Sequence, residues 1–110
     1  MEKIVLCIED IILGYLVESG DDYAFYSNAD GIARAKYEYP LDMMLFRLKE
    51  RGVSEYDNIP YPFSSFMSGT YREDLMIKAN IHPSDSDFVR LFKLAGLKMT
   101  QQNFQIYRAK

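Results

Sequence analysis

The feature that most constrains the fold is the apolar stretch near the start of the chain. Lys3 to Ile8 places hydrophobic side chains on both faces of an extended segment, which is typical of a central strand covered on both sides. Glu9-Asp10 predicts a tight turn, and Ile11 to Glu18 a second strand, in which Gly14 indicates a bulge or a close backbone approach. We therefore expect the chain to begin with antiparallel strands.

The strand pattern continues into the second quarter of the chain. Ser19-Gly20-Asp21-Asp22 is typical of a turn, and Tyr23 to Tyr26 predicts a short third strand. After a second turn signal at residues 28–31, small and aromatic side chains alternate with charged ones, and this predicts a fourth strand with one solvated face. The side chains on its other face are Ala33, Ala35, Tyr37 and Tyr39. Pro40 is expected to end or redirect that strand.

The segment from Leu41 to Arg51 fits two structures. Its apolar residues have the spacing of a helix that Gly52 would stop, and we favour that interpretation, but part of the segment also fits an extension of the sheet.

The last third predicts helices and then a final strand. Thr70 with Glu73 forms a capping-box pattern before a short helix that Asn80 would end, and Ser84 with Asp87 repeats the pattern. The second helix stacks Phe88, Leu91, Phe92 and Ala95 on one side and stops at Gly96, and Arg90 and Lys93 are expected on its solvated side. Residues 103–108 alternate like a strand. The order predicts one α+β domain over residues 1–110, an antiparallel β-meander followed by a small helical part and a short C-terminal strand.

Charge and cysteine content narrow the function classes. Sixteen Asp and Glu against thirteen Lys and Arg leave the chain mildly acidic, which argues against direct nucleic-acid binding. The sequence contains no run of about eighteen apolar residues, so we expect no membrane span. The single cysteine, Cys7, cannot form an internal disulfide, so we expect a cytoplasmic location.

The residues predict no catalytic, cofactor-binding or metal site. His82 is the only histidine and is placed next to Pro83 in a loop, without the partners that a general base or a metal ligand needs. Cys7 lies in an apolar strand, where a thiol behaves as a small hydrophobe. We expect a non-enzymatic binding module, and the competing hypothesis is a small enzyme that uses His82 or Cys7.

Nine tyrosines and seven phenylalanines are many for a chain of this length. Aromatic residues fill cores, and tyrosine is also enriched at protein interfaces. Phe63, Phe66, Met67 and Tyr71 stand close together behind Pro60 and Pro62. Such a cluster is either a corner of the core or a plug for a groove on a partner.

Four segments, in this order, resemble the N-terminal subdomain of HipA-type serine/threonine kinases, the toxins of bacterial toxin–antitoxin systems. The first two are Gly14-Tyr15-Leu16 and Phe25-Tyr26, which are similar to elements of that subdomain's β-meander. Residues 62–75 stand where the family has a Phe-rich short helix and a turn, with Phe66-Met67-Ser68 in place of the family's Leu-Pro-Glu. Residues 87–96 are similar to its Asp-x-Phe-x-x-Leu-x-x-x-Gly helix.

The resemblance implies a function. In the family, a free-standing copy of this subdomain acts as an antitoxin by binding a separate kinase subunit, in systems that also include a helix-turn-helix DNA-binding protein. By this similarity we expect an accessory subunit that restrains a HipA-type kinase. The expected partner-binding residues are Phe63, Phe66, Met67, Ser68, Tyr71 and Arg72. The alternative is an aromatic-rich module that self-associates or binds another protein.

Overall fold

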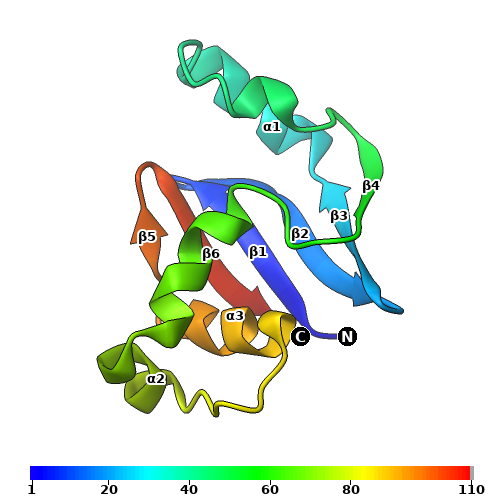
Figure 1. Cartoon of the computed structure of the whole chain (residues 1–110). Coiled ribbons are helices and arrows are strands. Elements are labelled where there is room, and N and C mark those ends of the chain that lie inside the picture. Colours follow the sequence, from blue (N-terminus) through cyan, green and yellow to red (C-terminus); the bar gives the residue numbers. More distant parts are fainter. Residues whose placement is uncertain (110) are drawn as a thin grey trace.

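The computed structural model describes residues 1–109 and is built around one antiparallel sheet. The strand order is β4-β3-β2-β1-β6-β5, so the first and last long strands lie side by side (Figure 1). The strands are β1 (Lys3–Ile8), β2 (Ile11–Ser19), β3 (Asp22–Ser27), β4 (Gly52–Tyr56), β5 (Thr100–Gln101) and β6 (Phe104–Ala109). β1 is an interior strand, as its apolar sequence predicts.

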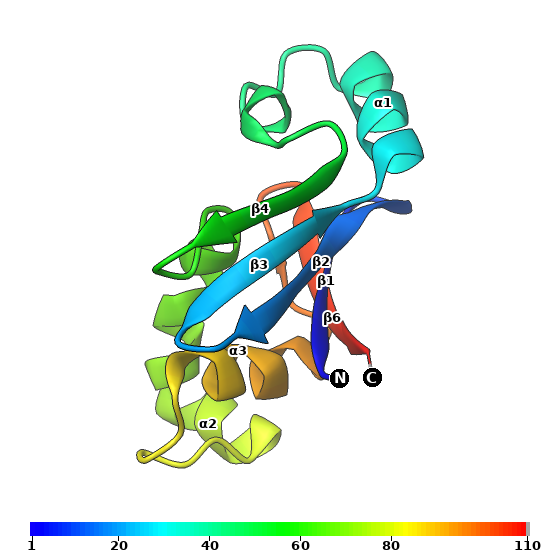
Figure 2. The ribbon, with the colours of Figure 1, turned by 90° about the vertical axis from the view of Figure 1, so that its right-hand side faces the viewer.

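The helices are segregated from the strands. They are α1 (Ala29–Glu38), the 3₁₀ helices η1 (Leu45–Arg47) and η2 (Phe63–Tyr71), α2 (Glu73–Ala79) and α3 (Asp87–Ala95). Figures 1 and 2 show η2, α2 and α3 on one face of the sheet, whereas α1 and the loop after it extend beyond one end. This arrangement confirms the predicted α+β class, with helices η2, α2 and α3 followed by a C-terminal strand, although α1 and η1 come before strand β4.

The main core lies between the sheet and η2, α2 and α3. Ile4, Leu6 and Ile8 of β1 alternate toward that face and are fully buried, as are Phe88 and Leu91 of α3. In the described part of the chain, no helix lies on the opposite face of the sheet (Figure 2). Val5 and Cys7 point to that face and are nevertheless buried among strand side chains. The side chains of β1 are therefore buried on both faces of the sheet, as expected, but helices cover only one of these faces.

Gly14 forms the irregularity that the sequence predicts. The β1–β2 register shifts between Leu6 and Cys7, opposite Gly14, whose φ is 150°. A Cβ atom there would lie 2.2 Å from the carbonyl oxygen of Tyr26 on the neighbouring strand. Glycine is required because both the backbone conformation and the close approach exclude a side chain.

The predicted strand over residues 33–39 is wrong, because residues 29–38 form helix α1. Small alanines in an alternating pattern also fit a helix, and here Gly31, Ile32 and Ala35 form the buried strip at helical spacing. Tyr37, which the strand pattern placed on the same face as Ala35, is 87% exposed. Asn28 fixes the turn into the helix, since its backbone N–H donates to Leu13 O and its side-chain amide to Ile12 O, each at 2.9 Å.

The favoured helix between Leu41 and Arg51 is also wrong in extent. Only Leu45–Arg47 is helical, as one 3₁₀ turn, and Leu45 is its buried residue. The unpredicted strand β4 follows and pairs with β3 at the edge of the sheet. Successive turns with their own backbone hydrogen bonds replace the longer helix here. Only one side chain of η1, Leu45, is buried, so a longer helix would gain little from packing.

The capping residues differ from the prediction, although the helices they were meant to start exist. The Thr70 hydroxyl donates to Met67 O at 2.7 Å and closes η2, so α2 begins without a side-chain cap. Ser86, not Ser84, caps α3 by accepting from the Val89 N–H. Asn80 ends α2, as predicted, and it does so in the left-handed conformation. β6 confirms the final strand, and the two-residue β5 was not predicted.

Candidate protein-binding surface

The structure places two of the six predicted partner-binding residues in the core. Phe63 is 1% and Phe66 is 3% exposed, and the Phe63 ring makes an edge contact with Phe25 at 5.8 Å between centroids. Both rings lie between η2 and the sheet. Neither can reach a partner without unfolding, so the core alternative describes these two residues.

The other predicted residues lie closer to the surface. Met67 is half-buried, whereas Ser68, Tyr71 and Arg72 are exposed. The Tyr71 ring is covered on one side by the Arg90 guanidinium, 4.3 Å from its centroid. Arg72 forms an ion pair with Asp74 at 2.9 Å, and this hydrogen bond lowers the pKa of the Asp74 carboxyl. Arg72 therefore already has a carboxylate partner within the chain.

Arg90 was expected on the solvated side of α3, and this prediction is wrong. It is 5% exposed and donates to three backbone carbonyls: Asp85 O at 3.2 Å, Thr70 O at 3.0 Å and Pro83 O at 2.9 Å. One side chain thus ties the end of η2 and the loop before α3 to that helix. Its planar fork of donors suits such a set of carbonyls. Arg90 holds the fold together around residues 63–72 and is not a ligand site.

A different segment exposes several large apolar side chains. Eleven large hydrophobic side chains are exposed in the described residues, and four of them fall within residues 37–46. They are Tyr37 at 87%, Leu41 at 92%, Met43 at 72% and Phe46 at 54%. We call residues 37–46, the end of α1 and the loop into η1, the projection, because they extend past the end of the sheet (Figures 1 and 2).

Hydrogen bonds hold the backbone of the projection. Tyr39 N donates to Ala35 O at 2.7 Å, and Asp42 N donates to Tyr39 O at 3.1 Å. The Asp42 carboxylate accepts from the Met44 N–H at 3.0 Å. At its base, α1 docks through Gly31 directly against the Ile12 carbonyl. The exposed side chains are thus carried by a bonded loop rather than by an unsupported one.

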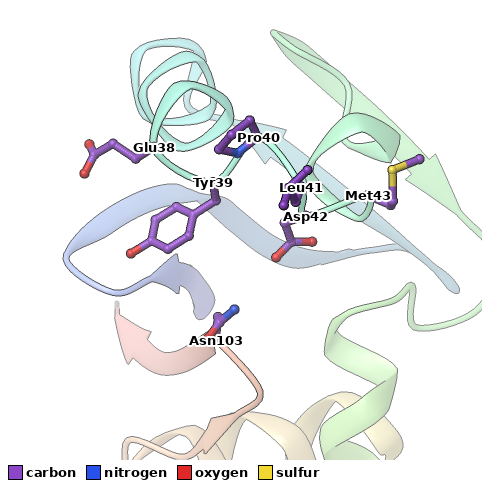
Figure 3. A pocket seen from close by; sticks show the side chains of 7 residues that line it. All are labelled: Glu38, Tyr39, Pro40, Leu41, Asp42, Met43 and Asn103. Atoms are coloured by element: carbon purple, nitrogen blue, oxygen red, sulfur yellow. The ribbon is translucent and has the colours of Figure 1, made fainter.

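A shallow cavity of about 530 Å³ opens beneath the projection. Figure 3 shows Tyr39 and Asp42 pointing from the projection toward Asn103, on the turn between β5 and β6. The residues that line it are Glu38, Tyr39, Pro40, Leu41, Asp42, Met43 and Asn103. Its wall therefore combines exposed apolar side chains, two carboxylates and one amide.

The electrostatics around this cavity are acidic. Glu38 and Asp42 line it, and Glu9 shares a neighbouring hollow with Asn103. Burial raises the pKa of the Tyr39 hydroxyl, and the negative charges of Glu9, Glu38 and Asp10 raise it further. Arg34 is the cation among these groups; it pairs with Glu38 and lies 3.5 Å from Asp10.

The uncovered face of the sheet is a second apolar surface. Ile12, Tyr26 and Val53 are between 38% and 45% exposed there. Tyr15 stacks on Tyr26 with 5.0 Å between the ring centroids, and the Lys3 ammonium lies over the Tyr15 ring. These side chains largely contact one another, so this surface is flatter and less exposed than the projection.

The two candidate catalytic residues lie in different parts of the fold, His82 in the loop before α3 and Cys7 in β1. His82 is exposed in the loop before α3 and uses its backbone N–H to donate to Asp85. Cys7 is 4% exposed, and burial raises the pKa of its thiol, which disfavours the nucleophilic thiolate. Among residues 1–109, no group of three or more His, Cys, Asp and Glu side chains is placed to hold a metal ion. No described helix has the length and apolar character needed to cross a membrane.

Sequence reasoning missed the projection because it sought regular elements in residues 33–51. The available signal was the density of large apolar residues around Pro40, which match neither a strand nor a helix over their whole length. Comparisons with known proteins add no family: no protein-family model and no curated protein matches the chain. The resemblance to HipA-type kinases stays a prediction.

Proposed function

We propose that this chain is a non-catalytic subunit that binds another protein. The observation that supports it is the projection, where the side chains of Leu41 and Met43 are 92% and 72% exposed on a hydrogen-bonded loop. Leaving a leucine exposed forgoes about 2 kcal/mol of burial free energy. Several such residues in one short segment mark a surface that a partner covers.

The proposed partner is a HipA-type serine/threonine kinase, which the chain restrains, in a cytoplasmic complex that can include a helix-turn-helix DNA-binding protein. This part rests on the order of the similar motifs at residues 14–16, 25–26, 62–75 and 87–96. Burial of Phe63 and Phe66 shifts the expected contact to exposed side chains. The projection is the first candidate, and Ser68, Tyr71 and Arg72 are the second.

The test has two stages. The tagged full chain is purified from its native cells, and we expect a protein with a kinase fold to co-purify in stoichiometric amount. Autophosphorylation of that kinase is then measured while the chain is added, and it should fall as the complex forms. Recovery of the chain without any kinase, or unchanged kinase activity in a formed complex, would contradict the proposal.

Solution mass separates the alternative of self-association. A subunit that awaits a partner should remain monomeric at micromolar concentration. A homodimer that persists on dilution, with no other protein bound, would favour the self-associating module.

A further inference from the structure

The projection also indicates what kind of partner segment it binds. Its apolar residues are interleaved with acids: Glu38 and Asp42 line the same cavity as Leu41 and Met43. Glu9 and Asp10 add their charges from the β1–β2 turn, since both act on the Tyr39 hydroxyl. Against these four carboxylates stand the guanidinium of Arg34, already paired with Glu38 and Asp10, and the ammonium of Lys36. The Lys36 ammonium lies over the Phe46 ring and pairs with Glu50. The surface is therefore both apolar and negative.

We propose that the projection docks a short segment of a partner protein in which large apolar side chains are flanked by Lys or Arg. This inference rests on the proposed binding function and adds the chemistry of the partner. The apolar side chains of the segment cover Leu41 and Met43 and enter the cavity beside Tyr39. Its cations pair with Glu38 and Asp42, and the Asn103 amide offers a donor and an acceptor to its backbone.

Other occupants fit the charges less well. Nucleic acids and anionic membrane surfaces carry the same sign as the four carboxylates and would be repelled. A second copy would bring its own acidic projection, and the chain carries a net charge of −3. A segment with basic and large apolar residues is not repelled by the four carboxylates. Its positive charges are attracted to them at long range, which speeds association.

The experiment uses the full chain and a synthetic peptide of about ten residues, with Leu and Phe alternating with Lys and Arg, the length that an extended segment needs to cross such a surface. A matched peptide carries Glu at every basic position. Binding is measured by fluorescence anisotropy and mapped by amide NMR shifts. We expect the basic peptide alone to bind, with shifts at residues 37–43 and 102–103. Raising the salt from about 0.05 M to about 0.5 M should weaken it strongly because exposed charges become screened.

Two double variants divide the surface into its apolar and its acidic parts. Leu41→Ala/Met43→Ala and Glu38→Gln/Asp42→Asn should each weaken the basic peptide about tenfold, and the second should also flatten the salt dependence. Asparagine at position 42 keeps an oxygen for the Met44 N–H. The matched controls are Ile77→Ala, a 75% exposed isoleucine on α2, and Asp21→Asn in the β2–β3 turn. Both controls should bind like the original chain.

Several results would overturn the inference. They are equal binding of both peptides, no binding of the basic one, shifts confined to another surface, or unchanged affinity in both double variants. Tighter binding to anionic vesicles or to DNA, or a homodimer that Leu41→Ala/Met43→Ala dissociates, would assign the surface to another occupant. If the kinase co-purifies equally well with Leu41→Ala/Met43→Ala, the inference fails while the proposed function stands; if no kinase co-purifies, the function fails and the peptide result is judged alone.

Discussion

Replacing Gly31 by alanine tests how α1 is attached to the sheet. In an exposed helix this change stabilises by about 1 kcal/mol, because alanine has the higher helix propensity. Here a Cβ atom at position 31 would lie 1.8 Å from the Ile12 carbonyl oxygen and 3.0 Å from the Asn28 amide nitrogen. α1 would have to move away from β2 by on the order of 1 Å, since packed atoms resist closer approach. The structure thus predicts the opposite sign from propensity.

The magnitude follows from what that movement breaks. Overpacking costs about 1–3 kcal/mol, and loss of the Asn28–Ile12 hydrogen bond costs about 1 kcal/mol more. After the propensity gain is subtracted, Gly31→Ala should destabilise by about 2 kcal/mol, or lower Tm by about 10 °C in a chain of this size.

Urea unfolding followed by circular dichroism measures the effect. Ala33→Gly is the matched control, because Ala33 is exposed on the same helix and should lose only about 1 kcal/mol of helix propensity. A free energy of unfolding that rises in Gly31→Ala would refute the close docking of α1 on β2. It would also remove the basis for placing the projection at the end of the sheet.

Three further predictions concern buried or paired groups. Arg90→Lys should lower the free energy of unfolding by about 2–3 kcal/mol in urea titration, because one ammonium cannot replace the fork that holds three carbonyls. Burial raises the pKa of Cys7 above its ordinary value of 9.0, so the thiol keeps its proton in the fold and stability falls as the pH rises through and above 9.0; Cys7→Ala should remove that part of the slope. The hydrogen bond from Lys93 lowers the pKa of Asp85 below 3.8, so its contribution is present above that pH and is lost below it; Asp85→Asn should flatten the acid limb of thermal unfolding.

The strands of the sheet could be predicted from the sequence where their side chains are buried in the core. Lys3–Ile8 and Ile11–Ser19 are almost continuous in apolar residues, and Gly14 identifies the bulge without a structure. Helix α3 was predictable for the same reason, since Phe88, Leu91, Phe92 and Ala95 form one buried strip. In these elements the local pattern and the final packing impose the same requirement.

The exposure of the candidate binding residues was harder to predict, because the burial of a side chain depends on contacts with residues distant in the sequence. Phe63, Phe66 and Tyr71 are alike in sequence, yet Phe25 on β3 buries the first and Arg90 on α3 covers only part of the last. Arg90 itself looked solvated, since the three carbonyls that it binds come from backbone that no side-chain pattern describes. Tertiary contacts of this kind leave no periodic signal.

The segment where the pattern failed is also the segment where exposed large apolar side chains are concentrated. Between residues 29 and 51, Gly31, Ile32, Ala35 and Leu45 are buried, and Tyr39, Met44 and Leu48 pack half-buried against the core. The remaining large apolar residues, Tyr37, Leu41, Met43 and Phe46, are exposed and together follow neither a period of two nor one of 3.6. Their irregular spacing and their exposure both fit the proposed contact with a partner protein.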